Sequence, residues 1–118
     1  MPDDLSTVPL RLQPIQPANV FQALGNGTRQ TIIRHLATGA VLCVKDFVPL
    51  TRLHQDGVCL HLGVLRRAGI VEKVPPPDGD RRKSCYRIVP QLLVTRNGRL
   101  ELDCGSCVVR LGLPAAAA

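Results

Sequence analysis

Aromatic residues are nearly missing from this sequence. Trp is absent, and two Phe and one Tyr make up the aromatic 3% of its 118 residues. A chain of this length forms one domain with a modest core, and that core must therefore be aliphatic. Long apolar runs are also missing, since no stretch of about 18 uncharged apolar residues occurs, which excludes a membrane-spanning helix. The N-terminal segment lacks the basic-then-apolar order of a secretory signal, so we expect a cytoplasmic protein.

Recognisable catalytic patterns are missing as well. The sequence has no glycine-rich phosphate loop and no nucleophile elbow, and its histidines, His35, His54 and His61, lack the spacing of a zinc-protease helix. We therefore do not expect an enzyme. Acidic residues are few: nine Asp and Glu against 15 Lys and Arg give a net charge of +6 and a pI of about 9.6. A small domain with such an excess of positive charge often binds polyanions.

Five cysteines, an odd number, are spread along the chain. A small secreted domain would pair its cysteines, whereas a reducing cytosol leaves them as thiols that fill the core or bind metal. We expect unpaired thiols here.

The first half of the chain has helical patterning. Residues 1–18 contain four prolines, which predict an extended arm rather than a helix, with Leu10, Leu12 and Ile15 packing on the domain or on a second subunit. From Asn19 the apolar spacing predicts four helices. They cover residues 19–24, residues 28–37 with Asn26 as the N-cap, residues 43–48 closed by Pro49, and residues 55–68 followed by Gly69 in the C-cap position.

The second half of the chain alternates with a period of two. Residues 70–74 and 84–89 predict a hairpin whose long tip, PPPDGDRRK, is basic and stiffened by proline. Three further strand-like runs follow, with Asn97 and Gly98 as a two-residue turn, and predict a C-terminal three-stranded meander. Residues 114–118 are expected to form a frayed tail.

The order of these elements indicates an α+β fold. Short helices, the last one amphipathic, are followed at once by a basic hairpin, which is the order of a winged helix-turn-helix. The amphipathic helix fits the major groove of DNA, while the hairpin tip reaches phosphates or the adjacent minor groove. The charge distribution favours this interpretation: residues 51–88 hold eight of the 15 basic residues and four acids, so they carry +4 of the total +6.

Two segments resemble one family of bacterial regulators. FQALGNGTRQTIIRHLATG is similar to the family opening ALGNPTRxxILxxL, and VCLHLGVLRRAGIVEK is similar to the recognition segment VSxHLxxLxxAGLV. With the arginine-rich tip and Tyr86, they make residues 19–89 resemble the ArsR/SmtB type of transcriptional regulators. The resemblance implies a homodimer that binds a pseudo-palindromic operator in double-stranded DNA and represses transcription until an inducer binds.

The resemblance also sets the expected organisation of the chain. Residues 19–89 would be the DNA-binding winged helix-turn-helix domain, and residues 90–113 a β extension that serves dimerisation or sensing. This β-meander replaces the usual C-terminal dimerisation helix of the family. The recognition helix departs from the family pattern too, because Asp56, Cys59 and Leu60 replace common polar residues.

The candidate DNA-binding residues lie in the predicted recognition helix, just before it, and in the hairpin tip. Basic side chains supply phosphate contacts, whereas His, Gln and Thr side chains can read base edges. Val58, Leu62 and Leu65 share the opposite face of the helix and should be core, and His61 beside them is expected to be packed or hydrogen-bonded. The candidate contacts are Thr51, Arg52, His54, Gln55, Cys59, Arg66, Arg81, Arg82 and Lys83.

A second candidate site would use thiols. Cys104 and Cys107 have a CxxC spacing that can chelate a soft ion, but one pair is a weak zinc signal, and strand alternation also explains both as apolar filler around a tight turn. Cys43 lies in VLCVKDF, which resembles the family's metal-sensing ELCVCDL box with Lys45 in place of the second cysteine. A soft metal or metalloid ion could be held by Cys43 with Cys104 or Cys107 across a subunit boundary, and a metal, metalloid or redox signal acting on such thiols could relieve repression. Both interpretations stay open.

A different function also fits the sequence. Asp56, Leu60 and Gly63 on the would-be reading face are poor phosphate partners, and an exposed Leu60 would suit a protein partner. The alternative is a winged-helix protein-interaction module without specific DNA reading.

Overall fold

The computed structural model describes residues 15–114. The predicted arm, residues 1–18, and the predicted tail, residues 114–118, therefore fall mostly outside the described residues, as do Leu10 and Leu12. Ile15 is described, and it packs against the core as expected.

Helix α1 corrects the predicted end of the arm. It spans Pro17–Leu24 and so begins before Asn19. Pro17 lies in the first helical turn, where the missing N–H leaves no helical hydrogen bond unmade. A proline that was expected to exclude a helix instead starts one.

Helices α2 and α4 follow the prediction closely. In α2 (Gly27–Leu36) the Oδ1 atom of Asn26 accepts a hydrogen bond from the Arg29 backbone N–H at 3.1 Å, which makes Asn26 the N-cap. Helix α4 (Gln55–Arg67) ends just before Gly69, whose φ of +84° is the left-handed conformation that closes many helices.

Helix α3 is longer than the sequence predicted. It spans Val44–Thr51, so Pro49 lies inside the helix rather than closing it. A proline in a helix interior costs about 3 kcal/mol, and here the fully buried Phe47 holds the helix in the core. The carboxylate of Asp46 strengthens the N-terminus by accepting a hydrogen bond from the Cys43 N–H at 2.8 Å.

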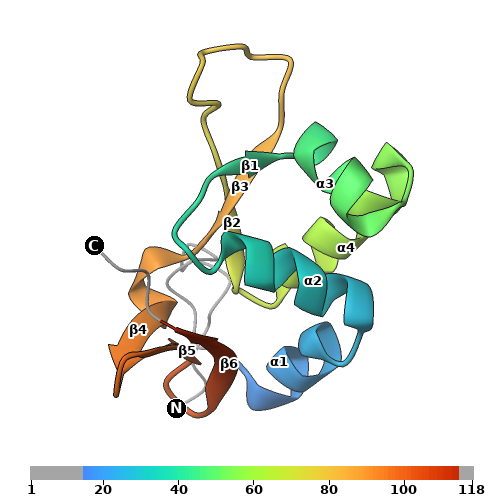
Figure 1. The fold of residues 1–118 in the computed structure, drawn as a ribbon. Coiled ribbons are helices and arrows are strands. Elements are labelled where there is room, and N and C mark those ends of the chain that lie inside the picture. The colour runs from blue at the N-terminus through green and yellow to red at the C-terminus, as the bar shows by residue number, and fades with distance from the viewer. Residues whose placement is uncertain (1–14, 115–118) are drawn as a thin grey trace, which may run out of the picture.

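Two antiparallel three-stranded sheets occur among the described residues. In the first, β3 (Cys85–Ile88) lies between β1 (Leu42–Cys43) and β2 (Val71–Val74). The sequence does not predict β1, because two residues are too few to show alternation. Strands β2 and β3 are the expected hairpin, and the loop between them projects from the body of the molecule (Figure 1).

The second sheet is the predicted meander. Its strands pair in chain order, and the turn between the first two contains Asn97 and Gly98 with φ of 53° and 72°. Positive φ at both positions is what a type I′ hairpin turn requires. The sheet consists of β4 (Leu93–Arg96), β5 (Arg99–Asp103) and β6 (Val108–Pro114), and a short 3-10 helix, η3 (Pro90–Leu92), precedes it.

Both sheets pack on the helices through one core. Phe47 is its largest fully buried side chain, and it is surrounded mostly by aliphatic residues, as the scarcity of aromatics predicts. Leu36, Leu62 and Ile88 come from the helices and the first sheet, while Leu102 comes from the meander. Because Leu102 belongs to the same cluster, the meander shares the core of the helices. None of the described helices is both long and apolar enough to cross a bilayer.

Candidate nucleic-acid interface

A three-residue turn joins α3 to α4. Its first residue, Arg52, has a φ of 59° and a ψ of 26°, the left-handed conformation that glycine adopts most easily. Thr51 donates its hydroxyl to the Phe47 carbonyl at 2.8 Å and accepts a hydrogen bond from the Leu53 N–H at 3.3 Å. The Thr51 hydroxyl, a candidate base contact, is therefore already engaged within the turn.

Helix α4 has one buried and one exposed face. Val58, Leu62 and Leu65 are fully buried, which confirms the prediction for this side of the helix. The opposite side is open, and Leu60 on it is 70% exposed. Together with the N-cap His54, the exposed residues are Gln55, Asp56, Cys59, Leu60, Arg66 and Arg67.

His61 joins α4 to the corner between α1 and α2. Its Nδ1 accepts a hydrogen bond from the Arg29 guanidinium at 3.1 Å, and Arg29 also donates to the Ala23 carbonyl at 2.6 Å. Burial, together with the positive charge of Arg29, lowers the pKa of His61 from 6.5. The imidazole is therefore neutral at pH 7, with an Nδ1 lone pair for the guanidinium. The expectation of a hydrogen-bonded histidine is confirmed.

Two aspartates shape the tip of the β2–β3 hairpin. Asp80 accepts hydrogen bonds from the Arg82 backbone N–H at 3.1 Å and from its guanidinium at 3.0 and 3.1 Å. Asp78 accepts from the Asp80 N–H at 2.9 Å and forms an ion pair with Lys83. The hydrogen bonds from Lys83 and Arg82 lower the pKa of Asp78 and Asp80 respectively, so both carboxylates are charged at neutral pH.

These pairs change the expected role of the tip. The sequence predicts that Arg81, Arg82 and Lys83 are all available to phosphates, but in the structure Arg82 and Lys83 are paired within the tip. Arg81 is exposed and has no ion-pair partner among residues 15–114. With two aspartates beside three basic residues, the tip carries a net charge of +1.

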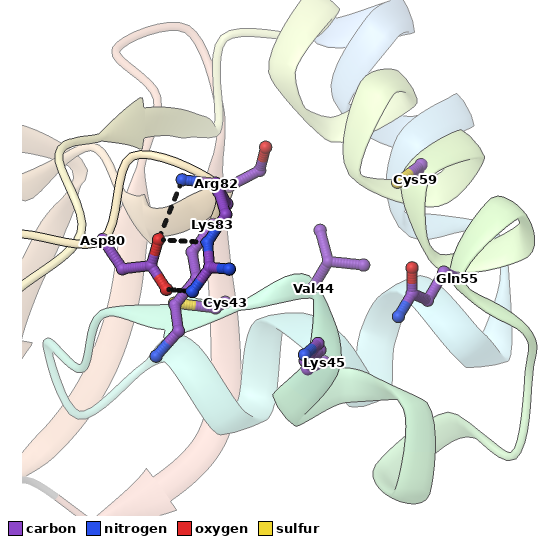
Figure 2. Close-up of a pocket in the computed structure, with 9 residues that line it drawn as sticks. Cys43, Val44, Lys45, Gln55, Cys59, Asp80, Arg82 and Lys83 are labelled. Carbon is purple, nitrogen blue, oxygen red and sulfur yellow. Dashed lines mark hydrogen bonds and ion pairs between the residues drawn. The ribbon is translucent and has the colours of Figure 1, made fainter. Parts of the chain in front are cut away.

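A groove of about 360 Å³ lies between the hairpin tip and α4 (Figure 2). Lys45 of α3 contributes positive charge to its lining, as do Arg82 and Lys83 of the tip. Gln55 and Cys59 line the α4 side of the same groove. The structure thus brings candidate residues from the helix and from the hairpin to one site.

A wider hollow of about 660 Å³ adjoins the start of α4. Its lining includes Lys45, His54, Gln55 and Asp56, so Lys45 and Gln55 belong to both hollows. Sequence reasoning did not select Lys45 as a DNA contact. The signal that was present is a basic residue in the first turn of α3, the helix before the predicted recognition helix.

A disulfide bond joins Cys43 to Cys85, which face each other across β1 and β3. The sequence predicts unpaired thiols, so this expectation is wrong for these two residues. With Cys43 in the disulfide, it offers no free thiolate to the predicted metal site with Cys104 or Cys107, which stays a prediction. Among residues 15–114, no three His, Cys, Asp or Glu side chains are grouped to bind a metal.

The CxxC pair lies at the turn between β5 and β6. The Cys104 N–H donates to the Cys107 carbonyl at 2.8 Å, and Cys104 is buried in the core with Cys107 packed against it. Burial, reinforced by Cys107, raises the pKa of the Cys104 thiol to about 11. A thiol that stays protonated at neutral pH is a poor metal ligand, so these observations favour the filler interpretation.

No protein-family model matches the chain. Over 55 residues it is 34% identical to a protein of Methanocaldococcus jannaschii named uncharacterized HTH-type transcriptional regulator MJ1325. The match covers 47% of this chain and 62% of that protein. The chain therefore spans less than two thirds of the length of this relative.

Two solved structures have a similar fold. HlyU from Vibrio cholerae N16961 gives a TM-score of 0.53 at 24% identity, over 60% of this chain and 72% of that chain. NadR, solved in complex with 4-hydroxyphenylacetate, gives a TM-score of 0.52 at 23% identity, over 63% of this chain and 52% of that chain. The chain has a winged helix-turn-helix fold. In this winged helix, α3 and α4 are the helix-turn-helix pair and the β2–β3 hairpin is the wing, as the sequence predicts.

Proposed function

We propose that this protein binds specific double-stranded DNA and regulates transcription. The observation that carries the proposal is the groove between α4 and the wing, which is lined by Gln55 and Cys59 of the helix and by Arg82, Lys83 and Asp80 of the wing. An α-helix fits the major groove, which is about 12 Å wide, while a hairpin beside it reaches the phosphate backbone. The name of the M. jannaschii relative, an HTH-type transcriptional regulator, supports the same function.

In this proposal the exposed face of α4 reads bases. Gln55, at the N-terminal end of the helix, has an amide that can bond to both N6 and N7 of an adenine. Leu60 is exposed five residues further along and can contact the methyl group of a thymine. His54 and Cys59 lie on the same exposed surface and complete the base-reading set.

Basic residues around this face hold the phosphates. Arg52 lies in the turn before α4, Arg66 lies near its end, and both are exposed. On the wing, Arg81 is ready to bind, whereas Arg82 and Lys83 exchange their aspartate partners for phosphates when DNA arrives. Such contacts position the protein on the duplex and make binding sensitive to salt.

We also propose a homodimer that acts as a repressor of the ArsR type. The resemblance of residues 19–89 to that family supports both features. Two recognition helices about one DNA turn apart, roughly 34 Å, would read a pseudo-palindromic operator. Sedimentation equilibrium should give a mass near twice 12.8 kDa, and a reporter driven by the bound promoter should rise when the gene for this protein is deleted.

Fluorescence anisotropy with DNA from upstream of the protein's own gene tests DNA binding. We expect a preference for one fragment over scrambled DNA of the same composition, and a log–log plot of affinity against salt with a steep negative slope. No preference, or a flat salt dependence, would contradict the proposal.

Two variants separate the roles of helix and wing. Replacing Arg81, Arg82 and Lys83 together by Gln should weaken binding to all sequences and flatten the salt slope by about 0.9 for each phosphate interaction removed. Gln55→Ala should relax preference at one base position and leave the slope unchanged. Arg99→Gln is the matched control, because Arg99 is an exposed arginine of the second sheet.

The alternative is a protein-interaction module. Leu60, 70% exposed in the middle of the α4 surface, is the observation that favours it. Leu60→Ala discriminates the two functions. If the helix reads DNA, the variant loses preference at a thymine position and keeps its salt slope. If the surface binds a protein, specific DNA binding is absent in both the wild type and the variant.

A further inference from the structure

A third hollow, a pocket of about 310 Å³, lies between the α1–α2 corner and β6. It shares no lining residue with the groove beside the wing. Its apolar lining comes from Leu24 of α1, Ile33 of α2, and Val109 and Leu111 of β6. All four side chains are aliphatic.

Two exposed arginines line the same pocket: Arg34, in the last turn of α2, and Arg110 of β6. Arg110 is 87% exposed, and its partner Glu101 lies 3.4 Å away. The Glu101 carboxylate also pairs with Arg96 at 3.1 Å. Arg34 has no ion pair within residues 15–114. The pocket therefore combines an aliphatic lining with positive charge that carboxylates of the described chain only partly neutralise.

We infer that this pocket binds a small aliphatic carboxylate. A guanidinium and a carboxylate form strong, often bidentate, hydrogen bonds, and two arginines at one site favour an anion. The aliphatic lining accepts an alkyl body, and none of the described lining residues is aromatic. A volume of 310 Å³ is at the lower end of the range of about 300–1,000 Å³ for ligand pockets, which favours a medium-length chain over a larger ligand.

Hydrogen bonds also connect the pocket to α4, so that a bound ligand changes DNA binding. This step rests on the proposed function. Gln30 donates to the Leu24 carbonyl at 2.6 Å. Its neighbour Arg29 donates to the Ala23 carbonyl and to His61 of α4. A carboxylate bound beside Leu24 therefore contacts the α1–α2 corner that is hydrogen-bonded to α4. Binding of the carboxylate then changes the affinity of the protein for DNA.

Octanoate and octanamide are matched probes for this site, because they share an alkyl chain and differ in charge. Calorimetric titration of the full chain should show octanoate binding at least tenfold more tightly than octanamide. Amide resonances of Leu24, Ile33, Val109 and Leu111 should shift on addition of octanoate. Equal affinity for the two probes, absence of binding at millimolar octanoate, or shifts confined to other residues would overturn the inference.

Arginine variants test the charge requirement. Arg34→Gln and Arg110→Gln should each weaken octanoate binding at least threefold and leave octanamide binding unchanged. Both side chains are exposed, so the variants should fold, and Arg99→Gln on the same sheet should bind octanoate like the wild type. Unchanged octanoate affinity in the double variant would overturn the inference. Binding only after removal of residues 1–14 would also overturn it, because that segment would then be the occupant.

The effect on DNA is measured separately. Saturating octanoate should change DNA affinity at least threefold in the wild type, and should have no effect in the Arg34→Gln, Arg110→Gln double variant. An unchanged DNA affinity despite octanoate binding would overturn the regulatory step alone. If the protein binds octanoate and no DNA, the proposed function fails while the ligand site stands.

Discussion

The disulfide between Cys43 and Cys85 should make a large contribution to stability. It links residues 42 positions apart in the sequence and ties the start of α3 to the wing strand β3. A cross-link stabilises a protein chiefly by restricting the unfolded chain, and the restriction grows with the length of the closed loop. Reduction of this bond is therefore expected to lower the free energy of unfolding while leaving most native contacts in place.

The size of the effect follows from the loop length. For a loop of this size the chain-entropy relation gives about 4 kcal/mol at room temperature. A domain has a total unfolding free energy of only about 5–15 kcal/mol, so the bond supplies a substantial part of the stability. With a urea m value of about 2 kcal/mol/M, the unfolding midpoint should fall by about 2 M on reduction.

Two measurements check this expectation. Thiol titration of the urea-unfolded chain without reductant should find three free thiols, those of Cys59, Cys104 and Cys107. Urea unfolding followed by circular dichroism, with and without a phosphine reductant, should show the shift in midpoint. Cys59→Ser is the matched control, because it removes an exposed thiol and keeps the disulfide, so its midpoint should respond to the reductant as the wild type does.

Two results would refute the reasoning. Five titratable thiols in the unfolded, unreduced chain would show that the bond does not form. A midpoint that moves by less than about 0.5 M on full reduction would show that the loop closure contributes little to stability. Replacing Cys43 and Cys85 together by Ala should reproduce the reduced midpoint and remove any further response to reductant.

Three further predictions concern single side chains of the interface. Because the pKa of His61 is lowered in the folded state, the unfolded chain binds more protons below about pH 6.5, and stability falls as the pH drops through that value. His61→Asn keeps an acceptor for Arg29 but does not titrate, so the stability difference between wild type and variant should change between pH 7.5 and 5.5. A constant difference in urea midpoints would contradict the assignment. Asp80→Asn keeps the backbone turn but weakens the pairing with the Arg82 guanidinium. Anisotropy should therefore show a several-fold gain in DNA affinity and a salt slope steeper by about 0.9. A loss of affinity would reverse the role given to Asp80. Arg52→Gly removes the steric strain of a left-handed non-glycine residue, so thermal unfolding should show about 1 kcal/mol more stability. DNA affinity should fall in the same variant. Retained affinity would remove Arg52 from the phosphate contacts.

The elements around the interface were largely predictable because local sequence decides them. Val58, Leu62 and Leu65 repeat at helical spacing and are all fully buried in α4. Asn97 and Gly98 form a turn whose positive φ values few other residue pairs tolerate. Each of these patterns depends on only a few neighbouring residues, so long-range packing did not change the structure that the local sequence predicts.

Pairings between distant segments were not predictable in the same way. Cys43 finds Cys85 only because β3 pairs with a two-residue strand that has no periodicity of its own. The pocket between the α1–α2 corner and β6 likewise exists only because β6 folds back against that corner, which places Val109 near Ile33. Neither of these long-range contacts can be predicted from the spacing of residues along the chain.

Charge shows most clearly what the structure adds to the sequence. Residues 51–88 contain eight basic side chains, but three of them, Arg82, Lys83 and Arg87, form ion pairs with Asp80, Asp78 and Glu72. Five basic side chains of this segment have no ion pair within residues 15–114, and these can meet phosphates without breaking an existing pair. The salt slope should therefore approach about 4.5 per protomer if the ion pairs persist on DNA, and rise to about 6.3 if Asp80 and Asp78 release Arg82 and Lys83 to phosphates. The measured slope thus reports whether the wing aspartates release their partners when DNA binds.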